Sequence, residues 1–198
     1  MLLQNENACF TMSSNKAVCR YPLYKIQSGR RTLSMLTIRK ARQEDLPSLL
    51  AIYNYEIEHG TATFDLNPKA LEERQKWFDL HSGGKYLLLV AEEDGEAVGY
   101  ASLSPYREWE AYAQTVELSI YVDAAHRRKG IGDQLMQAIL TYARERDDIY
   151  TVVSVITGDN EKSIRMHKKY GFEDCGRLKE VGMKFGRRLD VVNLQLFV

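Results

Sequence analysis

Apolar residues recur at helical spacing in several stretches of this chain. After Asp45 and Pro47, which suit a cap and a first turn, they return every three or four positions as far as Gly60. A second, strongly amphipathic helix is predicted from Gly130 to about Arg146. Two shorter helices are predicted, one opened by the Asn-Pro pair at 67–68 and ended by the glycines at 83–84, the other over residues 163–170.

Alternating and β-branched runs between these helices predict the strands. The predicted strands are residues 37–41, 85–92, 97–103, 115–122, 150–157, 172–179 and 187–198. An Asp94–Gly95 turn joins the second and third of them as a hairpin. The resulting order, βααβββαβαββ, is typical of an α+β (mixed α/β) fold and not of a doubly wound series.

The first 34 residues differ from the rest in charge and in pattern. They carry the basic residues 16, 20, 25, 30 and 31 against the single acid Glu6, and their apolar positions follow no period. They lack the apolar stretch of a secretory signal, although their basic, acid-poor composition is loosely compatible with an organelle transit peptide. We expect residues 1–34 to be a poorly ordered extension and residues 35–198, opening at Met35, to be the functional domain.

Length and composition exclude several classes of protein. A chain of 198 residues and 22.8 kDa suits one domain. Lys+Arg and Asp+Glu number 27 each, which argues against a dedicated nucleic-acid binder, and a mean hydropathy of -0.39 argues against a membrane protein. Cys9, Cys19 and Cys175 are too few for a disulfide framework and indicate the cytoplasm. No histidine spacing predicts a metal site.

Candidate chemistry concentrates where the strand 115–122 leads into the helix at Gly130. The sequence Arg127-Arg-Lys-Gly-Ile-Gly132 combines three cations with glycines that let backbone approach a ligand. Together with the free N–H groups of a first helical turn, these residues suit a pyrophosphate. The pattern is neither a P-loop nor a dinucleotide fingerprint, whose third small residue would replace Leu135. Alternatively, the glycines only permit a tight turn and the cations are solvated.

The order of motifs around this junction resembles the GNAT acetyltransferase superfamily over residues 36–197. The segments that carry the resemblance are Ser119-Ile-Tyr-Val122, residues 126–132, Asn160-Glu-Lys-Ser-Ile164 and His167-Lys-Lys-Tyr-Gly-Phe172. Residues 115–122, with Val181-Gly-Met-Lys-Phe-Gly186 and Leu189-Asp190, are similar to the phosphinothricin/methionine-sulfoximine acetyltransferase branch. Arg188 departs from that branch, which usually has Trp there.

The resemblance implies a twisted mixed sheet with helices on both faces, splayed between its fourth and fifth strands. Acetyl-CoA, as co-substrate, would lie in that gap, and no metal is implied. The residues implied to bind it are Ile120, Tyr121 and Val122 through their backbone, Arg127, Arg128, Lys129, Gly130, Ile131 and Gly132 at the turn, and Asn160 and Ser163 along the pantetheine arm. The family also implies a homodimer.

Acetyl transfer to an amine requires the neutral amine, and therefore a general base. Glu117 lies in an apolar strand, where partial burial would raise its pKa, and it occupies the position of the base in the family that the chain resembles. Alternation also permits Glu117 to face solvent. His167 stands where many GNAT enzymes carry a tyrosine that protonates the leaving thiolate, and Tyr170 follows it. A single helical histidine is, however, more often a packing residue.

The branch resemblance implies an N-acetyltransferase that moves an acetyl group from acetyl-CoA to the α-amine of a small amino acid. Methionine sulfoximine, methionine sulfone and phosphinothricin are substrates of this type. The alternatives on the same fold are an acetyltransferase of protein or peptide amines and a non-catalytic acyl-CoA-binding sensor. No nucleic-acid or membrane partner is expected.

Such a substrate needs donors for its carboxylate and for an oxygen-rich side chain. Arg107 offers a guanidinium fork just before the strand that carries Glu117, and Tyr106 and Tyr112 offer hydroxyls. Phe64 is expected to form an apolar wall. The alternative for Arg107 is a surface ion pair with an acid at position 108 or 110.

Overall fold

The computed structural model describes residues 18–27 and 30–198, with side chains from Met35 onward. The helices are α1 (Leu46–His59), α2 (Leu71–Leu80), α3 (Ile131–Arg144) and α4 (Glu161–Lys169). The strands are β1 (Val18–Gln27), β2 (Arg30–Lys40), β3 (Leu88–Glu93), β4 (Glu96–Pro105), β5 (Thr115–Val122), β6 (Thr151–Thr157), β7 (Glu173–Lys184) and β8 (Arg187–Phe197). From β2 onward the order is the one that the sequence predicts.

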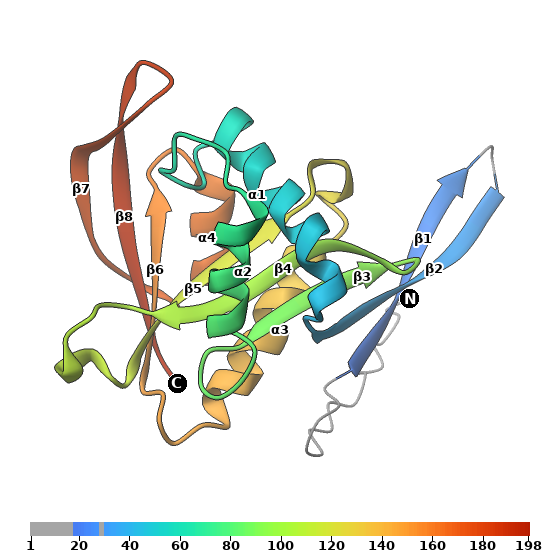
Figure 1. The fold of residues 1–198 in the computed structure, drawn as a ribbon, viewed down its shortest axis with the longest axis horizontal. Coiled ribbons are helices and arrows are strands. Elements are labelled where there is room, and N and C mark those ends of the chain that lie inside the picture. Colours follow the sequence, from blue (N-terminus) through green and yellow to red (C-terminus); the bar gives the residue numbers. More distant parts are fainter. Residues whose placement is uncertain (1–17, 28–29) are drawn as a thin grey trace, which may run out of the picture.

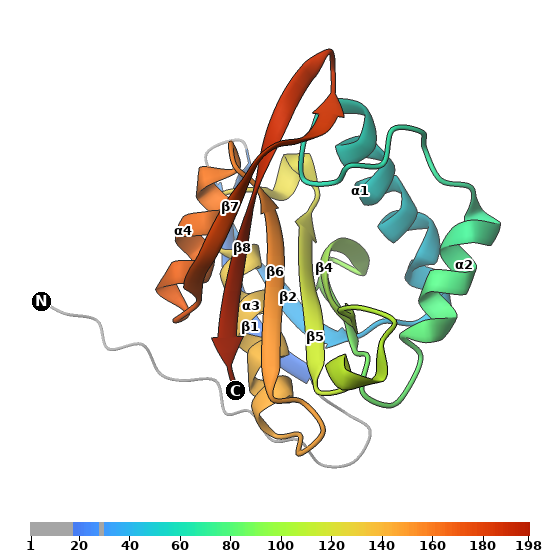
Figure 2. The same cartoon turned by 90° about the vertical axis from the view of Figure 1, so that its left-hand side faces the viewer.

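The strands form one mixed sheet in the order β1-β2-β3-β4-β5-β6-β8-β7. Every neighbouring pair is antiparallel except β5 and β6, which run parallel. Figures 1 and 2 show α1 and α2 over one face of this twisted sheet and α3 and α4 over the other. Two separate apolar clusters occupy the two faces. The predicted mixed α/β fold with helices on both faces is confirmed.

The beginning of the sheet lies partly in the segment for which the sequence predicts no regular element. β1 pairs with β2 along its whole length, from Val18 opposite Arg39 to Gln27 opposite Arg30. β2 pairs with β3 only from Leu36 to Lys40. The proposed domain boundary at Met35 therefore falls inside β2, and residues 1–17 lie outside the described residues. That the domain works without residues 1–34 stays a prediction.

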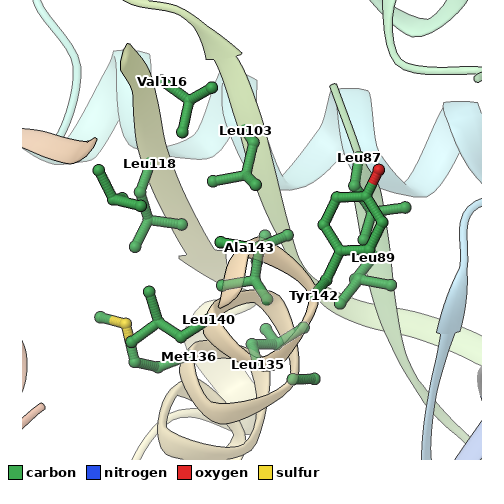
Figure 3. Close-up of a cluster of buried hydrophobic side chains, with 14 of the residues drawn as sticks. Leu87, Leu89, Leu103, Val116, Leu118, Leu135, Met136, Leu140, Tyr142 and Ala143 are labelled. Atoms are coloured by element: carbon green, nitrogen blue, oxygen red, sulfur yellow. The ribbon is translucent and has the colours of Figure 1, made fainter. Parts of the chain in front are cut away.

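The apolar stripe of α3 fixes the orientation of β5. Leu135 and Met136 on α3 are fully buried against Val116 and Leu118 of β5 (Figure 3). Burial of each such side chain contributes roughly 1.5–3 kcal/mol, and a one-residue slip of the strand would turn Val116 and Leu118 away from α3 to the other face of the sheet. Since strand side chains alternate, Glu117 is directed to the opposite face of the sheet, beneath α1 and α2.

β5 and β6 separate after a short paired stretch. Their parallel register contains only three pairs, from Thr115 opposite Thr151 to Glu117 opposite Val153. Beyond these pairs, β5 stays bonded to β4 on one side and β6 to β8 on the other. These are the fourth and fifth strands of the sequence prediction, and the predicted splay between them is confirmed.

Candidate active site

The open edge of β5 is the first component of the site. Residues 118–122 pair with β4 but have no strand partner on the β6 side, so alternate N–H and C=O groups face the gap. A narrow cavity of about 40 Å³ occupies this gap, and Ser119, Ile120, Asn160 and His167 are among the residues that line it. An extended ligand can add to such an edge as an extra strand.

The turn before α3 is the second component. Arg128 and Gly130 both adopt left-handed backbone, with φ of 65° and 78°. The first helical bond runs from the Gln134 N–H to the Gly130 carbonyl, so the N–H groups of residues 131–133 have no partner within the helix. With the helix dipole, these groups form an anion site.

A pocket of about 330 Å³ joins the turn to the open edge of β5. The predicted cofactor residues that line it are Ile120, Tyr121, Val122, Arg127, Arg128, Gly130, Ile131, Gly132, Asn160 and Ser163. Lys129 is not among them, because its Nζ lies 3.4 Å from Oε2 of Glu93 instead. Thus the structure brings together the whole predicted set apart from one cation.

Other residues of the pocket come from elements that the sequence analysis did not connect with it. Glu56 of α1 is buried and pairs with the guanidinium of Arg127, which ties the turn to the opposite face of the sheet. Lys162 and Met166 of α4 complete the wall. Local sequence gives no signal for Glu56, since its partner lies 71 residues away.

Asn160 organises the start of α4. Its Oδ1 accepts a hydrogen bond from the Ser163 N–H at 3.2 Å, as a helix cap does. Nearby, the Thr157 hydroxyl donates to the Thr61 carbonyl at 2.5 Å, which joins the end of β6 to the loop after α1. Asn160 and Ser163 therefore lie together beside the open edge of β5.

Glu117 lies at the point where β5 and β6 part, opposite Ser104 of β4 and Val153 of β6. The side chain is half-buried, and within residues 35–198 its carboxylate has no hydrogen-bond or ion-pair partner. Burial raises the pKa of Glu117, while the charge of Arg107 lowers it. A half-buried carboxylate without a partner has the character of a general base.

His167 lines the gap, and its contacts decide which ring nitrogen carries the proton. It is 3% exposed, and its Nδ1 lies 2.8 Å from the Ser163 carbonyl, which can only accept. Nδ1 therefore carries the proton, and Nε2 of the neutral ring has no partner among the described residues. Because burial lowers the pKa of His167, the neutral ring predominates near pH 7. In this form Nε2 accepts a proton and does not donate one.

Tyr170 lies away from the gap. Its hydroxyl donates to the backbone carbonyl of Asp133 at 2.9 Å, at the start of α3, and Tyr170 lines neither the gap nor the larger pocket. The structure therefore separates the two predicted thiolate donors. The role of either as proton donor stays a prediction.

The predicted substrate residues between β4 and β5 lie together. The Arg107 guanidinium lies 4.2 Å from the centroid of the Tyr106 ring and donates to the Tyr106 carbonyl at 2.8 Å. The Tyr106 ring in turn meets Tyr112 edge-on at 5.4 Å. Within the part of the chain whose side chains are described, Arg107 forms no ion pair with Glu108 or Glu110, so that alternative is not realised.

Phe64 lies in the loop after α1, under the β7–β8 hairpin. A Cβ at Gly182 would come within 2.3 Å of the Phe64 ring, so a larger residue there would displace that ring. Lys184, also on β7, is buried, and its Nζ donates to the Thr63 carbonyl at 2.8 Å. The hairpin therefore holds the loop that carries Phe64 in place.

A buried cation on α2 was not anticipated from the sequence. Arg74 is 6% exposed, and its guanidinium lies 3.4 Å from the centroid of Trp77 and 4.5 Å from that of Tyr53. Its Nη2 donates to the Tyr100 hydroxyl at 2.7 Å, and Tyr100 stacks on Tyr121 of β5. This aromatic layer supports β5 from the α1–α2 face.

Two further features bear on the class of protein. In residues 35–198, no three His, Cys, Asp or Glu side chains gather where they could hold a metal ion. The helices of the described residues are all too short or too polar to cross a membrane.

Comparison with known proteins identifies what this arrangement resembles. The Acetyltransferase (GNAT) domain family matches residues 38–192. An L-methionine sulfoximine/L-methionine sulfone acetyltransferase of Pseudomonas paraeruginosa is 42% identical over 161 residues, covering 81% of this chain and 93% of that protein.

Two solved structures are similar along most of their length. A GNAT superfamily phosphinothricin acetyltransferase from Sinorhizobium meliloti, in complex with acetyl-CoA, has a TM-score of 0.79 and 34% identity over 82% of this chain and 88% of its own. A ribosomal-protein-alanine N-acetyltransferase from Brucella melitensis has a TM-score of 0.78 and 41% identity over 81% of this chain and 99% of its own.

Proposed function

This chain belongs to the GNAT acetyltransferase family, and on that premise we propose that it acetylates the α-amine of a small amino acid or analogue. Methionine sulfoximine, methionine sulfone and phosphinothricin represent the substrate class. The observation that carries the proposal is the position of Glu117, a half-buried carboxylate that has no partner in residues 35–198 and lies where β5 and β6 begin to part. The names of the relatives from Pseudomonas and Sinorhizobium support the same substrate class.

The residues present fit acetyl-CoA. The free N–H groups of residues 131–133, with Arg127 and Arg128 beside them, would hold the pyrophosphate. The open edge of residues 120–122 would bond the pantetheine amides, and Asn160 with Ser163 would flank that arm. The bound co-substrate supplies an activated acetyl thioester.

Glu117 would prepare the amine for transfer. It takes a proton from the substrate ammonium, which frees the nitrogen lone pair to attack the acetyl carbonyl carbon. The N–C bond forms, the C–S bond breaks with its electron pair passing to sulfur, and the thiolate takes up the second proton, which the nitrogen loses as it becomes an amide. The raised pKa of Glu117 matches a base that must work near neutral pH. The predicted donor to the thiolate is still His167 or Tyr170, but His167 could serve only after its Nε2 has taken up a proton, and Tyr170 only after its hydroxyl has left the Asp133 carbonyl.

Recognition of the amino acid would fall to the segment between β4 and β5. Arg107 has no carboxylate partner in the described part of the chain, so its fork is available to the α-carboxylate of the substrate. Tyr106 and Tyr112 would donate to the oxygen-rich side chain, and Phe64 would contact its apolar part.

Acetylation of a peptide N-terminus is the second candidate. It is favoured by the similarity to the Brucella structure, whose name gives a ribosomal protein as substrate. Such a substrate also presents an α-amine to Glu117 but has no α-carboxylate for Arg107. The two candidates therefore differ in their need for that guanidinium.

Release of free CoA thiol from acetyl-CoA tests the proposal. We expect turnover with the three amino-acid analogues and with a subset of the common amino acids, and little turnover with a peptide that begins with alanine. Turnover with the peptide alone would favour the second candidate. Binding of acetyl-CoA without any acetyl transfer would indicate the non-catalytic sensor.

We also propose a homodimer located in the cytoplasm. Four large apolar side chains at the β7–β8 hairpin are more than half exposed, namely Leu178, Val181, Met183 and Phe185. An apolar surface of this kind is typical of an interface between subunits. Light scattering that gives the mass of one chain would contradict the dimer. The small number of cysteines supports the location, which fractionation of the source cells tests.

A further inference from the structure

Three consecutive carbonyls in the loop after α1, those of residues 61–63, accept hydrogen bonds from three different strands. The first accepts from the Thr157 hydroxyl at the end of β6, and the second accepts from the Tyr121 hydroxyl of β5 at 3.2 Å. The third accepts from Nζ of Lys184 on β7 at 2.8 Å. Residues 61–63, which we call the strap, therefore link three strands through their backbone.

The two hydroxyl donors occupy matching positions on the strands that part. The last pair in the register of β5 and β6 is Glu117 opposite Val153. Tyr121 and Thr157 each lie four residues further along, where they would be opposite each other if the register continued. Since strand side chains alternate, both are on the same face of the sheet as Glu117. The strap thus takes the place of the ladder bonds that β5 and β6 lack here.

The links to the strap are protected from water. Thr157 and Lys184 are buried, and burial raises the pKa of Tyr121 well above its ordinary value, so that its hydroxyl keeps the proton it donates. A buried donor that loses its acceptor is left with a desolvation cost, so each link resists opening. The Tyr53 hydroxyl of α1, 2.9 Å from Oγ1 of Thr63, attaches the strap to a helix as well.

The strap also borders the two cavities of the proposed cofactor site. Ala62, its middle residue, lines both the pocket of about 330 Å³ and the gap of about 40 Å³ between β5 and β6. Tyr121 lines both cavities too, and Thr157 lines the gap. A ligand that extends from the turn before α3 into the gap must therefore pass the strap.

We propose that the strap sets the width of the gap for the pantetheine arm of acetyl-CoA, and that Tyr121 and Thr157 are positioning residues that act through it. The inference rests on the proposed function, which places that arm in the gap. With the width fixed, the arm bonds to the open edge of β5 and its thioester is held beside Glu117. Lys184 anchors the third carbonyl and so keeps the strap from shifting along the gap.

Calorimetry with two ligands tests the strap. Adenosine 3′-phosphate 5′-diphosphate is the nucleotide part of acetyl-CoA without the pantetheine arm. We expect Tyr121→Phe and Thr157→Val each to raise Kd for acetyl-CoA about three- to tenfold, as for the loss of one hydrogen bond. Kd for the nucleotide without the arm should not change, because this ligand does not enter the gap. Thr157→Ser, which keeps the hydroxyl, should bind acetyl-CoA like wild type.

The double variant distinguishes one shared strap from two separate contacts. If both hydroxyls act by holding the same strap, the loss of either releases it, and the second substitution adds little. Tyr121→Phe combined with Thr157→Val should therefore bind acetyl-CoA about as weakly as the weaker single variant. Effects that multiply would mean that the two hydroxyls contact the ligand independently, and would overturn the strap.

Tyr142→Phe and Thr141→Val are the matched controls. The Tyr142 hydroxyl donates to the Gly84 carbonyl at 2.7 Å and the Thr141 hydroxyl to the Gln137 carbonyl at 2.9 Å. Neither residue lines the gap or the larger pocket, so we expect no change in Kd for either ligand. If one of the two strap variants does not fold, the difference between the two ligands in the other variant decides the outcome.

The wild type separates this inference from the proposed function. If wild type binds acetyl-CoA no more tightly than the nucleotide without the arm, the arm does not lie in the gap, and the proposed placement of the co-substrate fails. If wild type prefers acetyl-CoA while Tyr121→Phe and Thr157→Val bind both ligands like wild type, only the strap is overturned. An equal rise of both Kd values would indicate a change of the whole pocket and would also overturn the strap.

Discussion

The two halves of β5 differ in how many neighbouring strands they pair with. Residues 115–117 pair with β6, and the last two of them also pair with β4, whereas residues 118–122 pair with β4 alone among the described strands. Both halves share the same apolar face, where Val116 and Leu118 pack on α3. The paired half holds Glu117 at a fixed position, and the unpaired half offers backbone to a ligand. Interrupting the partner strand is thus enough to convert a core strand into one wall of a binding site.

The largest effect is expected from changing the paired half. Glu117→Gln keeps the shape and removes the carboxylate, so kcat/KM should fall by about 10²–10⁴ at neutral pH. The loss should shrink at high pH, where the amine loses its proton unaided. Steady-state kinetics would measure the loss of kcat/KM. The control is Glu96→Gln, which changes an exposed acid at the start of β4. Normal activity at neutral pH would remove Glu117 from the role of base.

The same variant carries a stability prediction of defined sign. Because burial raises the pKa of Glu117 in the folded state, the folded protein binds more protons than the unfolded chain between the two pKa values. The contribution of Glu117 to stability therefore decreases as pH rises from the ordinary pKa through the folded one. At pH 7 the Tm of Glu117→Gln should equal or exceed that of wild type. A clear decrease would indicate a stabilising partner for the carboxylate.

The next largest effect is expected at the turn beside the unpaired half. A Cβ at Gly132 would lie 3.3 Å from Sδ of Met166, in the wall of the pocket proposed for acetyl-CoA. Gly132→Val should therefore raise Kd for acetyl-CoA on the order of a hundredfold, about 2.7 kcal/mol. Arg127→Ala should have a smaller effect, about 0.5–2 kcal/mol, because Arg127 is partly exposed. Calorimetry in which both variants bind like wild type would exclude the pocket as the cofactor site.

A smaller, selective effect is expected in the segment that leads into β5. Arg107→Lys replaces a fork with a point charge, so KM for the amino acid should rise at least about tenfold, or 1.4 kcal/mol. KM for acetyl-CoA should not change. Arg144→Lys, at the exposed end of α3, is the control. An amino-acid KM within twofold of wild type would place Arg107 outside the substrate site.

The smallest effect is expected from the far edge of the sheet. Deletion of residues 1–34 should leave Tm and turnover nearly unchanged, because β2 keeps its pairing with β3 from Leu36 to Lys40. Thermal unfolding and kinetics of the truncated chain would measure this. A large loss of either would make β1 and the first half of β2 part of the functional domain.

The sequence by itself determined the family and the order of elements from β2 onward, but not β1. Three local patterns each predict their element without any tertiary contact. They are the apolar stripe of α3, the alternation of β5 and the glycines of the turn before α3. The order of motifs from Ser119 to Phe172 gave the family, and that order in turn gave the splay of β5 and β6. Most residues of the proposed cofactor pocket could also be predicted, because most of its lining comes from two adjacent segments of the chain.

Only the tertiary structure decided how side chains from distant segments meet. The pairing of Glu56 with Arg127, the enclosure of Arg74 by aromatic rings and the contact of His81 with Ser104 each join separate elements. Which ring nitrogen of His81 carries the proton depends on the Trp77 carbonyl, which lies 2.6 Å from Nδ1. Helix and strand patterns are set by interactions over a few residues, whereas these contacts depend on how the packed elements cross, which no local pattern records.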